Sequence, residues 1–257
     1  MKNYRIPVFK AGNMLTHEML DAMMQYGIGF AEYSYAGYSD GVVAGCDVHG
    51  EKGVIYVEKG LVYHYGNLIT FEGGSVRASP SNEWQAVKLC VADMEQNPNY
   101  NERQIDIRMV TRLERERNSV ELCRVKLQRG AVIRSVYQSY EDFDTEYDTI
   151  NLIHAQWAAY GEEGIHPAVL NGFAADAMKH GISDARDISF IQQILSHGGR
   201  ALPRKAVQYY IAIRQGNSYK ELANGEIYKQ LGAILRQIRT GKAPEAAARK
   251  DRRIIVD

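Results

Sequence analysis

One stretch of the sequence has the spacing of a catalytic nucleophile: residues 37–41 read Gly-Tyr-Ser-Asp-Gly and match the G-x-S-x-G pattern of a hydrolase elbow. In that elbow the serine lies on a turn between a strand and a helix, and a His-Gly-Gly loop precedes it. Here strand-like Val42 and Val43 follow the serine, and the similar His-Gly-Gly at residues 197–199 comes much later in the chain instead of preceding it. We therefore interpret Ser39 as a hairpin-loop residue and reject a hydrolase triad, which Ser39→Ala would test.

Two further motifs lack an essential partner. Residues 17–21 begin like the helix of a zinc protease, but Asp21 stands where the second histidine should be. Residues 241–243, Gly-Lys-Ala, lack the first glycine and the hydroxyl of a phosphate-binding loop. The sequence therefore predicts no catalytic residue, no metal site and no cofactor, and we expect a protein that is not an enzyme.

Cysteine content and charge narrow the class of protein further. Cys46, Cys90 and Cys123 are far apart and odd in number, so we interpret them as reduced core thiols. The charges of the 31 basic and 31 acidic residues cancel, so the protein has no net positive charge to attract nucleic acid, and nucleic acid is not an expected partner. The chain has no run of apolar residues long enough for a membrane span and no secretory signal, which predicts synthesis in a bacterial cytoplasm.

The elements that carry these residues follow from hydrophobic spacing. Residues 14–26 read as a short helix, capped by Thr16 and stopped by Gly27, whose Met-rich face is expected to pack on its own domain or on a neighbour. From residue 30 to about 136, short alternating runs broken by glycine predict antiparallel strands. Residues 53–74 read as a three-stranded meander with turns at Glu58-Lys59-Gly60 and Gly66-Asn67.

The spacing becomes helical in the second half of the chain. The acidic residues 141–148 are most simply a solvated linker, with Asp148 or Thr149 capping the next helix, although clustered carboxylates also permit a metal-ligand reading. Four helices then follow, each starting at a proline or at a capping Asp or Asn and each ending at a glycine. The second of them, which begins near residue 184, is expected to bury Ile188, Ile191 and Leu195. Residues 242–257 read as a basic arm with an apolar end that could add a strand to a partner's sheet.

Two stretches of strand sequence are similar to a known family. Residues 54–71, with Gly60, Tyr63, Gly66 and Phe71 at recurring positions, resemble an element of phage-type baseplate and tail-fibre attachment proteins. Residues 120–133 resemble a late core strand of the same modules, although Cys123 replaces the usual alanine and no Asp-x-Arg follows. The resemblance covers most of residues 40–135 and implies a subunit of a multicopy assembly that docks on other tail or baseplate proteins.

Together these readings predict an α+β chain: an N-terminal antiparallel β barrel or sandwich followed by a C-terminal helical bundle. The predicted divisions are residues 1–26, a segment with a short helix; 27–145, a β-rich docking domain; 146–241, a helical domain; and 242–257, the arm. We expect a structural subunit of a virion or tail-like particle that associates with itself and with other tail proteins. The candidate interface residues are aromatic or apolar: Tyr33, Tyr35, Tyr38, Tyr63, Tyr65, Trp84, Ile254, Ile255 and Val256.

A binding module without catalysis is the alternative function. Trp84 and the strand tyrosines could stack on sugar rings, and the basic end of the chain could contact nucleic acid. The plainer reading of that basic end is a solvated helix terminus whose cations complement the helix dipole.

Overall fold

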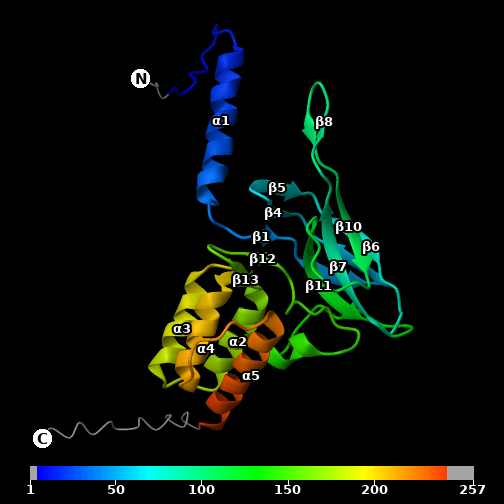
Figure 1. The fold of residues 1–257 in the computed structure, drawn as a ribbon, viewed down its shortest axis with the longest axis vertical. Helices are drawn as coiled ribbons and strands as arrows, with labels where there is room; N and C mark the ends of the chain where they lie inside the picture. The colour runs from blue at the N-terminus through cyan, green and yellow to red at the C-terminus, as the bar shows by residue number, and fades with distance from the viewer. Residues whose placement is uncertain (1–4, 242–257) are drawn as a thin grey trace, which may run out of the picture.

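The structure, a computed structural model, describes residues 5–241, and it combines five α-helices with several small sheets. One long helix stands apart at the N-terminal end, the strands gather beside it, and four helices form the opposite end (Figure 1). The helices are α1 (His17–Ser34), α2 (Pro167–Lys179), α3 (Ala185–Ser196), α4 (Arg204–Gln215) and α5 (Asn224–Thr240), with the 3-10 turn η1 at Tyr140–Asp144.

Fourteen strands form four sheets within the described residues. The first sheet has the order β14-β13-β12-β1-β4-β5; the others are β10-β7-β11, β2-β3-β6 and the pair β8-β9. The strands are β1 (Gly41–Gly45), β2 (Val48–Glu51), β3 (Val54–Val57), β4 (Gly60–His64), β5 (Asn67–Phe71), β6 (Gly74–Arg77), β7 (Trp84–Val91), β8 (Glu95–Gln96), β9 (Asn101–Glu102), β10 (Ile105–Val110), β11 (Ser119–Lys126), β12 (Trp157–Ala158), β13 (Glu163–Ile165) and β14 (Leu202–Pro203).

Strands in the first half and helices in the second follow the predicted order, but across residues 5–241 no sheet closes into a barrel. The first sheet also takes three short strands, β12, β13 and β14, from the second half of the chain. A single cluster of buried apolar side chains runs from Val42 to Leu235. The strands and the four C-terminal helices therefore share one continuous core.

The predicted meander of residues 53–74 is wrong in its first half. β3 pairs with β2 and β6, whereas β4 pairs with β1 and β5, so the chain changes sheets at Glu58-Lys59. A Cβ atom on Gly60 would collide with Cys46, so this glycine permits a close crossing of two segments rather than a hairpin turn. The second predicted turn is present, because Tyr65 and Gly66 both have positive φ and join β4 to β5 as a tight hairpin.

The N-terminal helix is longer than predicted. Thr16 caps it as expected, since its hydroxyl oxygen accepts a hydrogen bond from the Met19 backbone N–H at 3.3 Å. The helix continues through Gly27 and Gly29 to Ser34. Each helical glycine costs only about 1 kcal/mol relative to alanine, which is too little to end a helix whose neighbours favour it.

The acidic segment is packed rather than solvated, which corrects the linker prediction. Tyr140 and Phe143 in η1 are buried, and Tyr140 stacks on Tyr228 of α5 with ring centroids 4.6 Å apart. Each of these tyrosines donates its hydroxyl proton to the other's backbone carbonyl, at 3.0 and 2.8 Å. Asp148 caps no helix, and its carboxylate instead accepts a hydrogen bond from the Gln128 backbone N–H at 2.9 Å.

The four C-terminal helices begin and end close to the predicted residues. Pro167 opens α2, Asp184 caps α3 by accepting from the Arg186 N–H at 2.9 Å, and left-handed Gly216 and Gly241 follow α4 and α5. The predicted buried face of α3 is wrong in part. Ile191 is buried, but Ile188 and Leu195 are exposed because Phe190 and Ile194 face the core instead.

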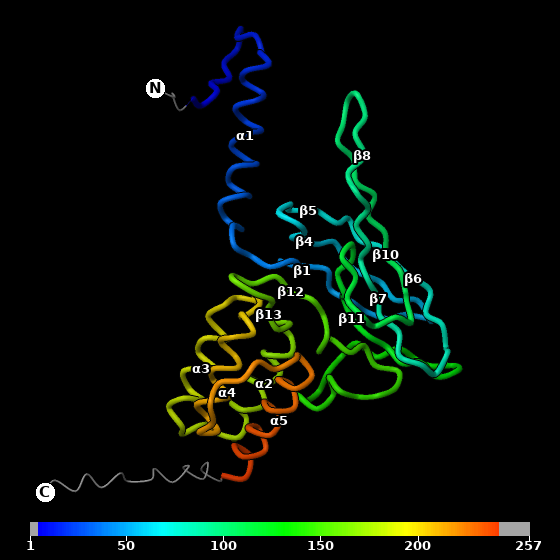
Figure 2. The backbone as a smooth tube through the Cα atoms, in the orientation of Figure 1, coloured from blue at the N-terminus to red at the C-terminus, as the bar shows by residue number. Residues whose placement is uncertain are grey.

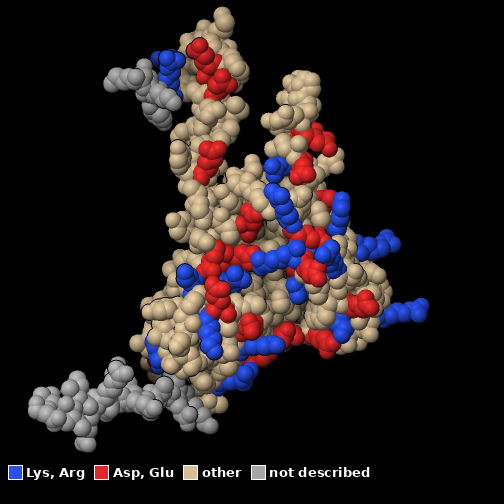
Figure 3. All heavy atoms as spheres, viewed as in Figure 1, with Lys and Arg blue, Asp and Glu red and all other residues tan. Residues whose placement is uncertain are grey.

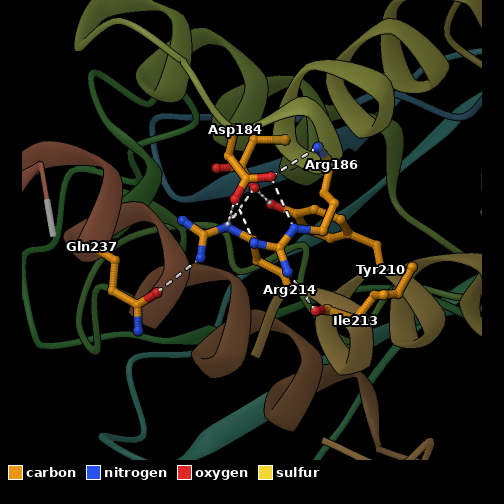
Figure 4. A network of polar contacts seen from close by, with 7 residues as sticks. Asp184, Arg186, Tyr210, Ile213, Arg214 and Gln237 are labelled. Carbon is orange, nitrogen blue, oxygen red and sulfur yellow. Dashed lines mark hydrogen bonds and ion pairs between the residues drawn. The ribbon is translucent and has the colours of Figure 1, made fainter. Parts of the chain in front are cut away.

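A buried ion pair joins α3 to α4 (Figure 4). The Arg214 guanidinium donates from Nε to Asp187 Oδ1 at 2.7 Å, and the two side chains are only 3% and 1% exposed. Tyr210 donates its hydroxyl proton to the same carboxylate oxygen at 2.8 Å. The pair is therefore satisfied by hydrogen bonds, as a buried charge requires.

Candidate docking surface

Helix α1 has no buried residue, although most of its side chains are apolar. It projects from the body, and only its last turn lies near β5 (Figures 1 and 2). In Figure 3 the projecting column is largely uncharged, with acidic atoms along part of it. Tyr26, Phe30 and Tyr33 are 66%, 67% and 86% exposed. The prediction that this helix packs by default on its own domain is therefore wrong.

The side chains of α1 divide its circumference unequally. At 100° per residue, the polar residues other than Ser34 in the last turn fall within roughly 100°, which we call the polar sector, and the apolar residues with the two glycines occupy roughly 220°. The polar sector consists of His17, Glu18, Asp21, Gln25 and Glu32, with Ile28 the one apolar residue inside it. A helix that packs one face on its own core shows a much narrower apolar stripe.

The middle of the apolar arc carries a regular row of large side chains. We call this row the seam; its residues, at alternating steps of four and three, are Met19, Met23, Tyr26, Phe30 and Tyr33. Such spacing keeps side chains on one line along a helix and is the spacing used in helix-to-helix packing. The row consists of methionines and of the aromatic residues tyrosine and phenylalanine. Methionine and aromatic side chains are both common at protein interfaces.

A groove runs between α1 and the segment before it. Ile6, Pro7 and Phe9 form one wall, and the seam residues from Met23 to Tyr33 form the other. Its volume is about 1170 Å³, and the lining is mainly apolar. Such a groove can bind an apolar helix or peptide, but it presents no group with the chemistry of a catalyst or a metal ligand.

The predicted interface tyrosines fall into two groups. Tyr35, Tyr38 and Tyr63 lie together where α1 meets the first sheet, with ring centroids 5.3 Å apart for Tyr35–Tyr38 and 6.3 Å for Tyr35–Tyr63. Tyr160 also belongs to this cluster, with its ring centroid 6.2 Å from that of Tyr38. The sequence did not predict this contact, because Tyr160 is far from the other three tyrosines along the chain. The cluster borders a cavity of about 390 Å³ that also touches His197 and Arg200.

The other predicted interface residues are dispersed. Tyr33 lies on the seam of α1, and Tyr65 stands at the β4–β5 turn with the Arg117 guanidinium 5.1 Å from its ring centroid. Trp84 begins β7 in a different sheet, opposite Lys126. Ile254, Ile255 and Val256 lie outside the described residues. Reasoning from the sequence missed Met23, Met24 and Phe30 as surface residues, because their spacing is equally that of a core-facing helix.

The residues with catalytic spacing are engaged in structural contacts. Ser39 is bound on both sides to Ala159: its N–H donates to the Ala159 carbonyl at 3.0 Å, and its hydroxyl oxygen accepts from the Ala159 N–H at 3.3 Å. The His197 Nδ1 lies 3.2 Å from the Gln193 carbonyl oxygen, within its own helix turn. His17 is exposed and pairs with Asp21 at 3.3 Å. Neither histidine is hydrogen-bonded to Ser39.

His64 is the most distinctive titratable group near the tyrosine cluster. Burial lowers its pKa, and the nearby Asp40 carboxylate, 3.7 Å from Nδ1, acts in the opposite direction. Asp40 itself accepts from the Tyr65 backbone N–H at 2.8 Å and so fixes the β4–β5 turn. Within residues 5–241 no group of three or more His, Cys, Asp or Glu side chains is arranged to hold a metal ion. In the same residues no helix is long and apolar enough to cross a membrane.

Comparison with known proteins gives matches among solved structures alone. No family model matches the chain, and no curated protein matches it. The chain is similar to a chain of the TssK-TssF-TssG baseplate subcomplex of a type VI secretion system, with a TM-score of 0.42, 8% identity, and coverage of 93% of this chain and 100% of that chain.

Two further solved structures are similar to this chain. A crystal structure of TssK has a TM-score of 0.38 and 10% identity, with 93% of this chain and 72% of that chain covered. A chain of the type VI secretion system baseplate complex has a TM-score of 0.37 and 10% identity, with 93% and 100% covered. Two of these three structures are of type VI secretion system baseplate assemblies, and the other is of TssK.

Proposed function

We propose that this chain is a structural subunit of a tail-like particle, without catalytic activity, which docks on neighbouring subunits through α1. The observation that carries the proposal is the apolar arc of α1, which the other residues of the described range 5–241 leave largely exposed. A helix that is apolar around most of its circumference is stable in water only when neighbours bury it. A contiguous exposed apolar surface of this kind is typical of a protein interaction site.

A tail or baseplate is proposed as the setting because of the resemblance in the strand sequence. The similar residues 54–71 form β3, β4 and β5, and residues 120–126 form most of β11, so both stretches belong to the sheets beside α1. The β-rich part, proposed as residues 27–145 and thus including the last turns of α1, then supports the projecting part of the docking helix, and the tyrosine cluster lies where α1 meets the first sheet. Phage, bacteriocin and injection-system particles are all members of this proposed class.

The proposal of a non-enzymatic role has support from the local structure of the candidate catalytic residues. The Ser39 hydroxyl accepts a hydrogen bond from the backbone N–H of Ala159, which lies just after β12, while Ser39 lies just before β1. A serine nucleophile needs a base within hydrogen-bond reach, and the hydrogen bonds of Ser39 go to Ala159 instead. Assays with ester and glycan substrates should therefore give equal, background rates for the natural chain and for Ser39→Ala.

Particle composition tests the function directly. Antibody or mass-spectrometric detection should find the full chain in purified tail-like particles from its source, together with other tail proteins. A chain with Met23→Glu and Phe30→Glu should remain folded, because neither side chain is buried, yet be absent from particles. Detection of the natural chain solely as a free protein, or normal incorporation of this variant, would refute the proposal.

A further inference from the structure

The apolar arc of α1 is too wide for a single neighbouring helix. A two-stranded coiled coil buries a narrow stripe along one side of each helix, whereas α1 offers roughly 220° of apolar surface. The seam occupies the middle of this arc, and Leu20, Met24 and Ala31 extend it on one side. The natural environment of α1 therefore includes at least two neighbouring elements.

We infer that α1 helices of further copies of this chain fill the groove and the arc, so that at least three copies associate through a bundle of α1 helices. This inference rests on the proposed docking role of α1 and names the partner as the chain itself. Every copy supplies the same seam, whose steps of four and three allow identical helices to interdigitate along their length.

The charges of α1 suit such a bundle. Glu18, Asp21 and Glu32 lie in the polar sector, opposite the apolar arc, and α1 contains no lysine or arginine. When the arc faces the bundle axis, the polar sector faces water, so the like charges of different copies lie on the outside and apart. The apolar arc itself therefore carries no ionised group whose burial would cost desolvation energy, and the Arg5 side chain that borders the groove is exposed.

The available area is sufficient for a stable association. Tyr26, Phe30 and Tyr33 are mostly exposed, and a buried aromatic side chain contributes about 150–250 Å². With the exposed side chains Leu20, Met23 and Met24 of the arc, and Leu15 just before the helix, this end of the molecule supplies approximately the 800 Å² per partner of a standard protein interface.

The position of α1 allows several copies to meet. The helix projects from one end of the molecule, clear of the strands and of the C-terminal helices (Figures 1 and 2). Gly27 and Gly29 have no atom within 4 Å of the position that a Cβ would take, so a neighbouring backbone can come close there. The projecting turns of α1, those before its last turn near β5, are therefore accessible to helices of other copies.

Native mass measurement of the purified full chain tests the inference. The expected mass is a multiple of 29.0 kDa, at three copies or more. Phe30→Glu, in the seam, should shift the association midpoint to at least about tenfold higher concentration, because it places a charge in the apolar centre. Ile28→Glu makes the same kind of change on the same helix but in the polar sector, so it should leave the midpoint within about threefold of the natural chain's value. A monomer or dimer at all concentrations, or equal effects of the two variants, would overturn the inference.

Cross-linking shows whether α1 meets α1. Under mild oxidation Tyr26→Cys should give covalent dimers, whereas Ile28→Cys should give no more than the natural chain. In the natural chain Cys46 and Cys123 are buried, and the half-buried Cys90 sets a background that both variants share. Abundant cross-links from Ile28→Cys and none from Tyr26→Cys would contradict the bundle. Failure here differs from failure of the proposed function: a monomeric chain that still needs the seam to enter particles docks on another protein. Conversely, if the chain forms the bundle but is absent from every particle, the inference stands and the proposed tail-like setting is refuted.

Discussion

Helices α1 and α5 have similar lengths, but their apolar side chains have opposite surroundings. In α5, Ile227, Leu231, Ile234 and Leu235 are buried against α2 and α4. In α1, side chains of the same kind remain largely exposed, since among the described residues little more than residues 5–9 and the edge of β5 lies near them. Apolar spacing thus identifies a face that must be covered, but it does not say whether the cover comes from the same chain.

The largest expected effect concerns the buried charge of the C-terminal helices, to which α1 has no counterpart. Arg214→Met leaves Asp187 buried without its ion-pair partner, which should lower the free energy of unfolding by about 3–5 kcal/mol. Arg186→Met removes the partner of Asp184, and since the Arg186 side chain is half-exposed the loss should be at most about 1 kcal/mol. Urea unfolding curves for both variants measure the difference. Equal losses would show that the buried pair does not hold α3 to α4.

Leucine truncation compares the two helices directly. Leu231→Ala in α5 should cost about 2–5 kcal/mol, because the side chain is completely buried and a cavity would remain. Leu20→Ala in α1 should cost less than about 0.5 kcal/mol in the unassociated chain, since Leu20 is about half-exposed there. The measurement is thermal or urea unfolding below the association concentration. A cost of several kcal/mol for Leu20→Ala would mean that α1 packs on its own body.

Acid should affect the C-terminal helices before α1. The Arg186 side chain holds the pKa of Asp184 at about 2, well below its ordinary value of 3.8. The folded state therefore releases the Asp184 proton more readily than the unfolded state, and the resulting stability is present above pH 3.8 and lost as pH falls towards 2. We expect about 1–2 kcal/mol from this group. Asp184→Asn should lower the unfolding free energy at pH 6 but not at pH 2, and a constant difference would exclude this cause.

The smallest expected effect is that of a polar-sector substitution on stability. Gln25→Ala replaces an exposed helix residue with a better helix former, so the free energy of unfolding should change by no more than about 0.5 kcal/mol. Circular dichroism and urea unfolding should be nearly superimposable on those of the natural chain. A large loss would show a contact of the polar sector within the chain.

Local signals in the sequence were sufficient for the C-terminal helices. Pro167, Asp184, Gly216 and Gly241 act through the backbone of their own element, so their effect does not depend on distant residues. The Gly66 turn was predictable for the same reason. The change of sheets at Gly60 was not, because that glycine is required by the approach of Cys46, a contact that spacing along the chain does not reveal.

The candidate site was predictable only in part. The Met-rich face of α1 was visible in the sequence, but exposed and core-facing helices use the same spacing, so its exposure was not. Tyr35, Tyr38 and Tyr63 were identified from composition, and the fold brings them together with the unpredicted Tyr160. Burial of Tyr140 and Phe143 within an acidic stretch was missed, because the surrounding carboxylates made the segment read as solvated.

Hydrogen exchange of residues 17–34 in the assembled particle tests the central claim most directly. The claim that neighbours cover α1 predicts slow exchange of these backbone amides in the particle and fast exchange in the unassociated Phe30→Glu chain, with α5 slow in both. Equally fast exchange of α1 in both samples would contradict the account, because the apolar arc would then remain uncovered after assembly.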